Sequence, residues 1–579
     1  MESRKPLRCC VRILTTGLLL LSALCLMAGP IGTCFGAEPV NLLDVMQQEL
    51  QSCTSHLAGS KEAPLYYLGY TITERHAFDL RVTDGALDEP QLTNQRYLDV
   101  DVRVGGMALD NTHQIREGNW RDNYSQRRVI GFPMESDPAA IRACLWNETE
   151  FQFRKAQERY TKVVANRQVK VEEQDTSHDF SAAEAQQFSE PFVLTHVDSV
   201  QWRGILKRVG KLLTEAPFVQ ESSGRLTVTD QNEYLVNSDG SRLQHGNHYL
   251  RLRFTVSGMA SDGMNLERTV GYDAASPAGL PTEETMQADA KRIVSELKAL
   301  IDAPLVEPYI GPAILLNRAS GVFFHEIFGH RIESHRQKSE TEGQTFTKKV
   351  GQLVLPDFIS VYDDPTMASF KGTDLRGYYS YDDEGTRAQR VTVVDKGVLR
   401  NFLTSRSPIA NFPTSNGHGR REYGQDVCSR QANLIVKSEK TVPYDQLRRL
   451  LIETCKRQGK PYGLIFNDIS GGFTMTARQG PQAFKVEPLL VYRVYADGRP
   501  DEVIRGVDIV GTPLTSFSKI IMAGDDDDVF NGTCGAESGW VPVSAVSPSV
   551  LVSEIEVEKK QKEQEKPPIL PPPGQSENP

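Results

Sequence analysis

The chain has 579 residues, of which 39% are hydrophobic and 24% are charged. This composition is typical of globular proteins, and the length is sufficient for two or three domains. The formal net charge is −10, and no strongly basic domain stands out, so the sequence gives no indication of nucleic-acid binding.

The N-terminal segment is typical of an export signal. An apolar stretch over residues 13–27 is followed by small residues up to Ala37. Four basic residues precede it: Arg4, Lys5, Arg8 and Arg12. This pattern predicts a signal peptide over residues 1–37 and an exported, periplasmic or otherwise extracytoplasmic protein with no membrane span after signal removal. An uncleaved membrane anchor is the alternative, although the run is slightly short for a span.

Five cysteines follow the predicted signal peptide: Cys53, Cys144, Cys428, Cys455 and Cys534. An odd number of cysteines in an exported chain needs an explanation, and metal ligation by one of them is such an explanation.

Helices and strands are both predicted over residues 38–303. Apolar residues at helical spacing predict helices, and alternating apolar residues predict strands. In chain order we expect a helix over 41–57, strands within 65–104, helical stretches at 137–145 and 151–169, a surface loop over 172–185, a helix over 194–213, strands within 226–270 and a helix over 282–300. We therefore expect an N-terminal mixed α/β domain.

The pattern changes after residue 303. A proline-containing segment at 304–312 predicts a domain boundary, and from residue 352 onward the pattern is mostly that of strands, interrupted by a helix over 444–457. We expect a mostly β domain over 304–558 and a disordered, proline-rich tail over 559–579. The predicted fold class is α+β.

The strongest chemical signal is His325-Glu326-x-x-x-His330. Two histidines flanking a glutamate are how many hydrolases bind zinc and place a base beside the water that the metal activates. In a regular helix, residues five apart differ by roughly 140° around the axis, so the two rings would diverge. We therefore expect an irregular backbone, either a π-type bulge or an end of the helix at Gly329. Two hydrogen-bonded histidines in a buried helix are the alternative.

A hydrolytic zinc site usually has three protein ligands and one water. Candidates for the third ligand are His335, for which a solvated loop histidine is the simpler interpretation, and Cys534, which lies in a glycine-rich segment. Glycines let the backbone approach closely and expose the thiol. A structural free cysteine is the alternative for Cys534.

Four blocks of sequence together resemble the TldD/PmbA family, metallopeptidases that are also called modulators of DNA gyrase. They are Gly-Val-Phe-Phe before the His325 motif, Asp-Asp-Glu-Gly at 382–385, Gly-Arg-Arg at 419–421, and Gly-Thr-Cys-Gly at 532–535 before Val-Pro-Val at 541–543. The resemblance is specific over residues 304–559 and weaker over 41–300.

The resemblance implies that His325, His330 and Cys534 bind one Zn²⁺ per chain and that Glu326 is the catalytic carboxylate. It implies a zinc-dependent peptidase acting on unfolded or flexible peptides, and a dimer formed with itself or with a related chain. Some members of the family lack the metal site, so a catalytically idle partner subunit of an active homologue is the alternative. The intact Glu326 favours the enzyme.

Other polar residues are candidates for supporting roles. His418, Arg420 and Arg421 are candidates for binding substrate and stabilising an oxyanion. The acidic residues at 382–384 are candidates for hydrogen bonding a ligand histidine, with a solvated turn as the equal alternative.

Overall fold

The computed structural model describes residues 41–60, 63–115, 128–168, 174–478 and 484–560. The predicted signal peptide and nearly all of the predicted tail lie outside these residues. Within them, no helix is both long enough and apolar enough to cross a membrane.

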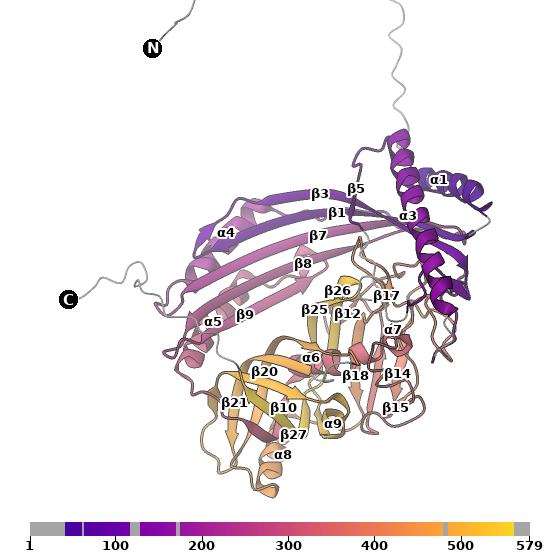
Figure 1. Cartoon of the computed structure of the whole chain (residues 1–579). Helices are drawn as coiled ribbons and strands as arrows, with labels where there is room; N and C mark the ends of the chain where they lie inside the picture. The colour runs from indigo at the N-terminus through magenta and orange to yellow at the C-terminus, as the bar shows by residue number, and fades with distance from the viewer. Residues whose placement is uncertain (1–40, 61–62, 116–127, 169–173, 479–483, 561–579) are drawn as a thin grey trace, which may run out of the picture. The chain divides into compact units, whose positions relative to one another are not determined.

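Long antiparallel strands dominate the N-terminal half (Figure 1). Nine strands of the described residues form one sheet: β1 (Leu65–Thr83), β2 (Ala86–Leu87), β3 (Gln91–Gly106), β4 (Leu109–Asp110), β5 (Ile130–Phe132), β6 (Gln187–Ser189), β7 (Glu221–Asn237), β8 (Arg242–Met259) and β9 (Asn265–Ala274). The main order is β4-β3-β1-β7-β8-β6, and β9 pairs with β8. One face of this sheet is buried against two helices. The core between them includes Leu226, Leu252 and Phe254.

The helices of this half are α1 (Leu42–Leu57), α3 (Pro138–Arg167), α4 (Ser199–Leu213) and α5 (Glu283–Asp302). Each helix begins after a residue whose side chain accepts a hydrogen bond from a backbone N–H of the first turn. In helix order these residues are Asn41, Asp137, Asp198 and Thr282. The helical stretches predicted at 137–145 and 151–169 form one continuous helix, because no proline or glycine separates them.

Two large sheets dominate the described residues of the C-terminal half. The eight-stranded sheet has the main order β10-β20-β21-β23-β27-β24-β19, and β22 pairs with β21. Its strands are β10 (Tyr309–Leu315), β19 (Thr441–Val442), β20 (Tyr462–Thr474), β21 (Phe484–Tyr495), β22 (Glu502–Ile504), β23 (Val507–Gly511), β24 (Ile520–Gly524) and β27 (Val550–Lys559).

The six-stranded sheet has the order β15-β14-β11-β18-β26-β25. Its strands are β11 (Ile359–Asp363), β14 (Val391–Asp395), β15 (Val398–Leu399), β18 (Asn433–Ser438), β25 (Asp528–Ala536) and β26 (Gly539–Ser547). Short pairs are formed by β12 (Ser369–Phe370) with β13 (Thr373–Asp374) and by β16 (Gly419–Arg420) with β17 (Cys428–Ser429). The remaining helices of the described residues are α6 (Asn317–Ile327), α7 (His335–Lys338), α8 (Tyr444–Arg457) and α9 (Pro513–Ser518). The predicted α+β class is confirmed.

Helix α6 packs against β20 of one sheet and against β25 and β26 of the other. Its apolar side holds Phe323 and Phe324, whose ring centroids lie 6.1 and 5.9 Å from that of Phe517. Burial of one such ring contributes roughly 1.5–3 kcal/mol, so this cluster fixes the helix between the sheets. The rotation of α6 that the cluster sets also determines where His325 and Glu326 point.

Candidate metal centre

The backbone between the two histidines is irregular, as their spacing predicts. Helix α6 ends at Ile327, and Gly329 begins a 3-10 turn that carries His330 (Gly329–Arg331). Of the two expected irregularities, the helix end occurs and the π bulge does not. The tighter turn brings the His330 ring back beside His325, with 5.1 Å between the ring centroids.

Glycine is required at position 329 because Gln431, on another segment, lies very close to it. A Cβ atom at this position would lie 1.8 Å from Oε1 of Gln431, so no larger side chain fits unless Gln431 moves. The dihedral angle φ of Gly329 is not in the left-handed region. Glycine is therefore needed at position 329 because Gln431 packs against it, and its backbone freedom is not required there.

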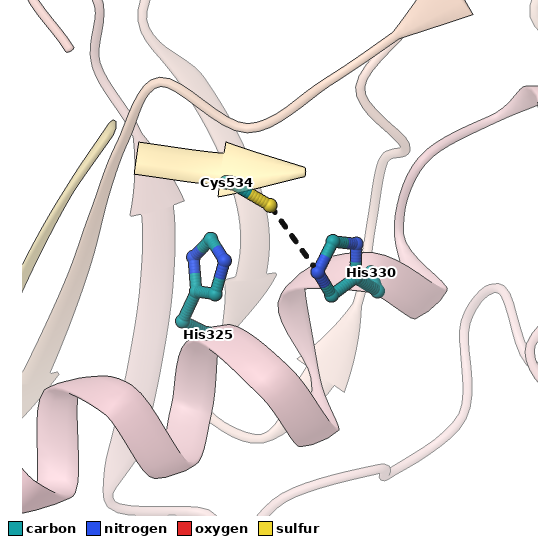
Figure 2. Close-up of side chains that lie close together, drawn as sticks. All are labelled: His325, His330 and Cys534. Carbon is teal, nitrogen blue, oxygen red and sulfur yellow. Dashed lines mark hydrogen bonds between the residues drawn. The ribbon is translucent and has the colours of Figure 1, made fainter. Parts of the chain in front are cut away.

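Cys534 completes a group of three potential metal ligands (Figure 2). It lies on β25, opposite Val541 of β26, and its Sγ is 3.4 Å from Nε2 of His330. One ligand atom from each of His325, His330 and Cys534 lies within 4.8 Å of the others, and all three residues are buried. Two imidazoles and a thiol are a donor set that suits zinc, which in hydrolytic sites usually takes three protein ligands and one water.

Charge at the centre favours the thiolate. Burial by itself would raise the pKa of the Cys534 thiol, but His330, Arg430 and His325 outweigh burial and hold that pKa well below its usual value. Conversely, burial would lower the pKa of His330, and the neighbouring Cys534 and Glu333 raise it well above its usual value. The same charges that favour the thiolate would favour a bound cation between these side chains.

Glu326 lies beside these ligands. Its Oε2 is 3.9 Å from Nε2 of His330, and burial raises the pKa of its carboxyl group although His325 and His330 oppose the shift. A carboxyl group whose pKa is shifted towards neutrality is suited to accepting and returning a proton.

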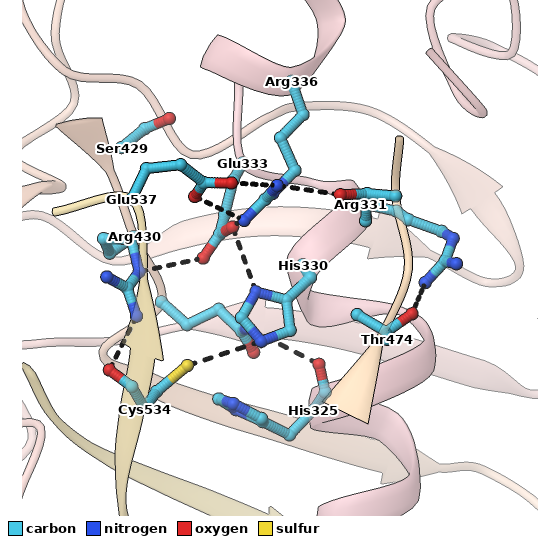
Figure 3. Close-up of polar contacts among 12 residues, drawn as sticks. His325, His330, Arg331, Glu333, Arg336, Ser429, Arg430, Thr474, Cys534 and Glu537 are labelled. Atoms are coloured by element: carbon cyan, nitrogen blue, oxygen red, sulfur yellow. Dashed lines mark hydrogen bonds and ion pairs between the residues drawn. The ribbon is translucent and has the colours of Figure 1, made fainter. Parts of the chain in front are cut away.

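A buried carboxylate, Glu333, supports His330 from the other side (Figure 3). Its Oε2 lies 3.1 Å from Nδ1 of His330 and 2.9 Å from Nε of Arg336, and its Oε1 lies 3.4 Å from Nε of Arg430. Burial would raise the pKa of Glu333, but the facing cations hold it well below its usual value. Because a carboxylate only accepts hydrogen bonds, Nδ1 of His330 carries the proton and Nε2 keeps its lone pair for a metal.

The sequence reasoning missed Glu333, although its position three residues after His330 was a local signal. We expect Glu333→Gln to weaken zinc binding about 10- to 100-fold, because the neutral amide holds the His330 ring less firmly. Competition with a chromophoric chelator measures this loss. Glu342→Gln is the matched control, since Glu342 lies 3.6 Å from the same Arg336 and is not a partner of His330. Equal zinc affinity in the two variants would contradict a positioning role for Glu333.

The centre opens into a cavity of about 980 Å³. The cavity lining includes His325, Glu326, His330 and Cys534, residues of β8, β9 and β20, and Trp540. Several charged groups in the lining already have partners. Arg251 donates a hydrogen bond to Asp273, and Arg268 forms an ion pair with Asp468. This volume is sufficient for a few residues of an extended peptide.

The other candidates for substrate binding lie elsewhere. His418, Arg420 and Arg421 do not line the cavity. His418 is fully buried, with Nε2 3.2 Å from Oδ1 of Asp363. Arg420 donates to the backbone oxygen of Gln431, and Arg421 lies 3.5 Å from Asp99. These contacts are structural, and positions outside the cavity give no support to a role in binding substrate.

Residues 382–384 are neither partners of the ligand histidines nor a solvated turn. Asp382 accepts the backbone N–H of Gly419, Asp383 that of Arg421, and Glu384 that of Arg406. Burial raises the pKa of Asp383 to about 7, with Glu233 adding to the shift. This acidic segment therefore joins buried loops of the C-terminal half.

His335 also differs from expectation. It begins α7, its side chain is only 13% exposed, and it stands outside the group formed by His325, His330 and Cys534. The interpretation as a solvated loop histidine is therefore wrong.

Comparison with known proteins agrees with the geometry of this centre. Residues 309–559 match the family model described as the PmbA/TldA metallopeptidase C-terminal domain. A metalloprotease from Archaeoglobus fulgidus is 29% identical over 269 residues, 45% of this chain and 56% of the relative. A zinc metalloprotease TldD homolog from Saccharolobus solfataricus is 26% identical over 270 residues, 46% of this chain and 55% of the relative. The chain thus spans little more than half the length of these two relatives.

Solved structures share the fold over most of the chain. A Thermotoga maritima protein described as a modulator of a DNA gyrase has a TM-score of 0.56 and 16% identity, covering 88% of this chain and 100% of that one. TldE from Thermococcus kodakarensis has a TM-score of 0.53 and 11% identity, covering 89% of this chain and 99% of that one. The family model and the named relatives lead to one conclusion: residues 309–559 form a C-terminal domain of the PmbA/TldD metallopeptidase family, and the chain shares its fold with these solved structures.

Proposed function

We propose that this protein is a zinc-dependent peptidase that hydrolyses peptide bonds in unfolded or flexible peptides. The observation that carries the proposal is the convergence of His325, His330 and Cys534 beside Glu326 at the wall of a cavity. The relatives named as metalloproteases add support.

The proposed chemistry is metal-assisted amide hydrolysis. His325, His330 and Cys534 would hold the ion, which supplies Lewis acidity to the scissile carbonyl and to a water molecule. Glu326 accepts a proton from that water at its carboxylate and returns it to the leaving nitrogen. Glu333 keeps the His330 ring oriented throughout. The thiolate of Cys534 adds negative charge and makes the ion a milder acid than one held by imidazoles alone.

A partner chain and export are parts of the same proposal. The structural neighbour TldE carries a name that pairs with TldD, in line with a dimer formed with a related chain, and a homodimer is the other form of this proposal. The predicted signal peptide over residues 1–37 supports an extracytoplasmic location. N-terminal sequencing of the secreted chain tests its removal.

The function is tested on a panel of unstructured peptides. We expect cleavage that stops on treatment with a zinc chelator and returns with added zinc. His325→Ala should lose the activity together with about one zinc per chain, measured by elemental analysis. Cleavage that persists without metal would contradict the proposal. A wild-type chain without metal and without cleavage would instead favour an idle partner subunit.

A further inference from the structure

A second group of potential metal ligands lies apart from His325, His330 and Cys534. It consists of His335 at the start of α7, Cys428 on β17, and Glu537 in the turn after β25. One ligand atom from each residue lies within 4.8 Å of the others. We propose that these three side chains form a second zinc site, distinct from the proposed catalytic one.

The orientation of the His335 ring points to a ligand. Its Nδ1 is 3.0 Å from the hydroxyl of Ser429, which fixes the ring. Its Nε2 is buried, has no hydrogen-bond partner among the described residues, and lies 3.5 Å from Oε2 of Glu537. A buried ring nitrogen without a hydrogen bond is costly, and a bound cation would remove that cost.

The charged groups around His335 also favour a bound cation. Burial would lower the pKa of His335, but Cys428 and Glu537 raise it to about 10 despite the opposing Arg336. The same two groups, Cys428 and Glu537, would also attract a bound cation.

The donor set is one that zinc accepts. An imidazole nitrogen, a thiolate sulfur and a carboxylate oxygen are all zinc ligands, whereas a thiolate disfavours calcium and magnesium. Arg336 binds both oxygens of Glu537, at 2.8 and 2.7 Å. Each carboxylate oxygen has a second lone pair, so this ion pair leaves Glu537 able to bind a cation. The side chains of His335 and Glu537 are 13% and 19% exposed, which leaves access for water as a fourth ligand.

The proposed second site is linked to the first through one arginine. Arg336 contacts Glu537 and also Glu333, which holds His330 (Figure 3). A cation bound by His335, Cys428 and Glu537 would therefore hold α7, β17 and the turn after β25 together. It would also fix the position of Arg336, which contacts Glu333 beside the proposed catalytic centre.

Cobalt titration of the metal-free full-length protein tests this inference. Both sites contain one cysteine, so each gives a thiolate-to-cobalt charge-transfer absorption when it fills. We expect the wild-type chain to bind about two equivalents, and Cys428→Ser and Cys534→Ser to bind about one each. Cys144→Ser is the matched control, since Cys144 is also a partly buried free cysteine but belongs to neither group. It should keep both equivalents.

A single wild-type equivalent that Cys428→Ser leaves unchanged would overturn the second site. If Cys428→Ser does not fold, alkylation of Cys428 by iodoacetamide gives an independent result, followed by mass spectrometry in Cys534→Ser. Zinc should slow this alkylation at least about 10-fold, because the bound sulfur no longer acts as a free nucleophile. Equal rates with and without zinc would mean that His335 and Cys428 form only an ion pair, and the proposal would fail.

Discussion

Glu326→Gln is expected to abolish measurable cleavage of unstructured peptides while leaving zinc bound. The substitution keeps the size of the side chain but removes the carboxylate that accepts the proton of water. Loss of a general base costs roughly 10²- to 10⁴-fold in rate. Because His325, His330 and Cys534 remain, the zinc content should not change. The measurements are kcat/KM on one peptide and elemental analysis of the same sample.

Glu342→Gln is the control for this experiment. Glu342 and Glu326 are both 8% exposed, so the two substitutions remove equally buried carboxylates. Only Glu326 lies beside the ligand histidines, with its carboxylate 3.9 Å from His330. Cleavage that survives Glu326→Gln unchanged would remove Glu326 from the mechanism, whereas loss of zinc in that variant would give it a structural role.

The second large effect is expected for Cys534→Ala, which removes a zinc ligand. Zinc bound by four protein ligands gains about 10–16 kcal/mol, so loss of one ligand should weaken binding on the order of 10²- to 10³-fold. Peptide cleavage should fall with the zinc content. Chelator competition in a Cys428→Ser background measures the zinc affinity of this centre without a contribution from the proposed second site.

Cys455→Ala is the matched control for Cys534→Ala. Cys455 is also a buried free cysteine, but it packs against Leu447 and Leu451 in an apolar cluster. Its substitution should lower stability by about 1 kcal/mol through lost packing and leave zinc bound. Undiminished zinc affinity in Cys534→Ala would contradict the model of three protein ligands.

Much of the secondary structure follows from local signals in the sequence. The helix predicted over 444–457 has those bounds in α8, and the helices predicted from residues 41 and 282 begin at those caps. Apolar spacing and capping act within a few residues, which is why the sequence determines them. The division within 137–169 was wrong because a change in composition does not end a helix that contains no breaking residue.

The candidate site was only partly accessible from the sequence. His325, Glu326 and His330 lie within six residues, so their chemistry and the irregular backbone between them could be predicted. Cys534 lies 204 residues after His330; the residues alone made it one of two candidates, and the family resemblance selected it. No local rule could identify Gln431 as the residue that requires glycine at position 329.

Local sequence patterns were enough to predict most helices and strands and the histidine motif. The partners of the buried charges could be seen only in the folded chain: Glu333 contacts His330, Arg336 contacts Glu537, and His418 contacts Asp363 and does not line the cavity. Folding also brings Cys428 beside His335. Periodicity and capping act within a few residues, whereas a buried ionic or metal-binding group takes its partners from distant segments that packing places beside it.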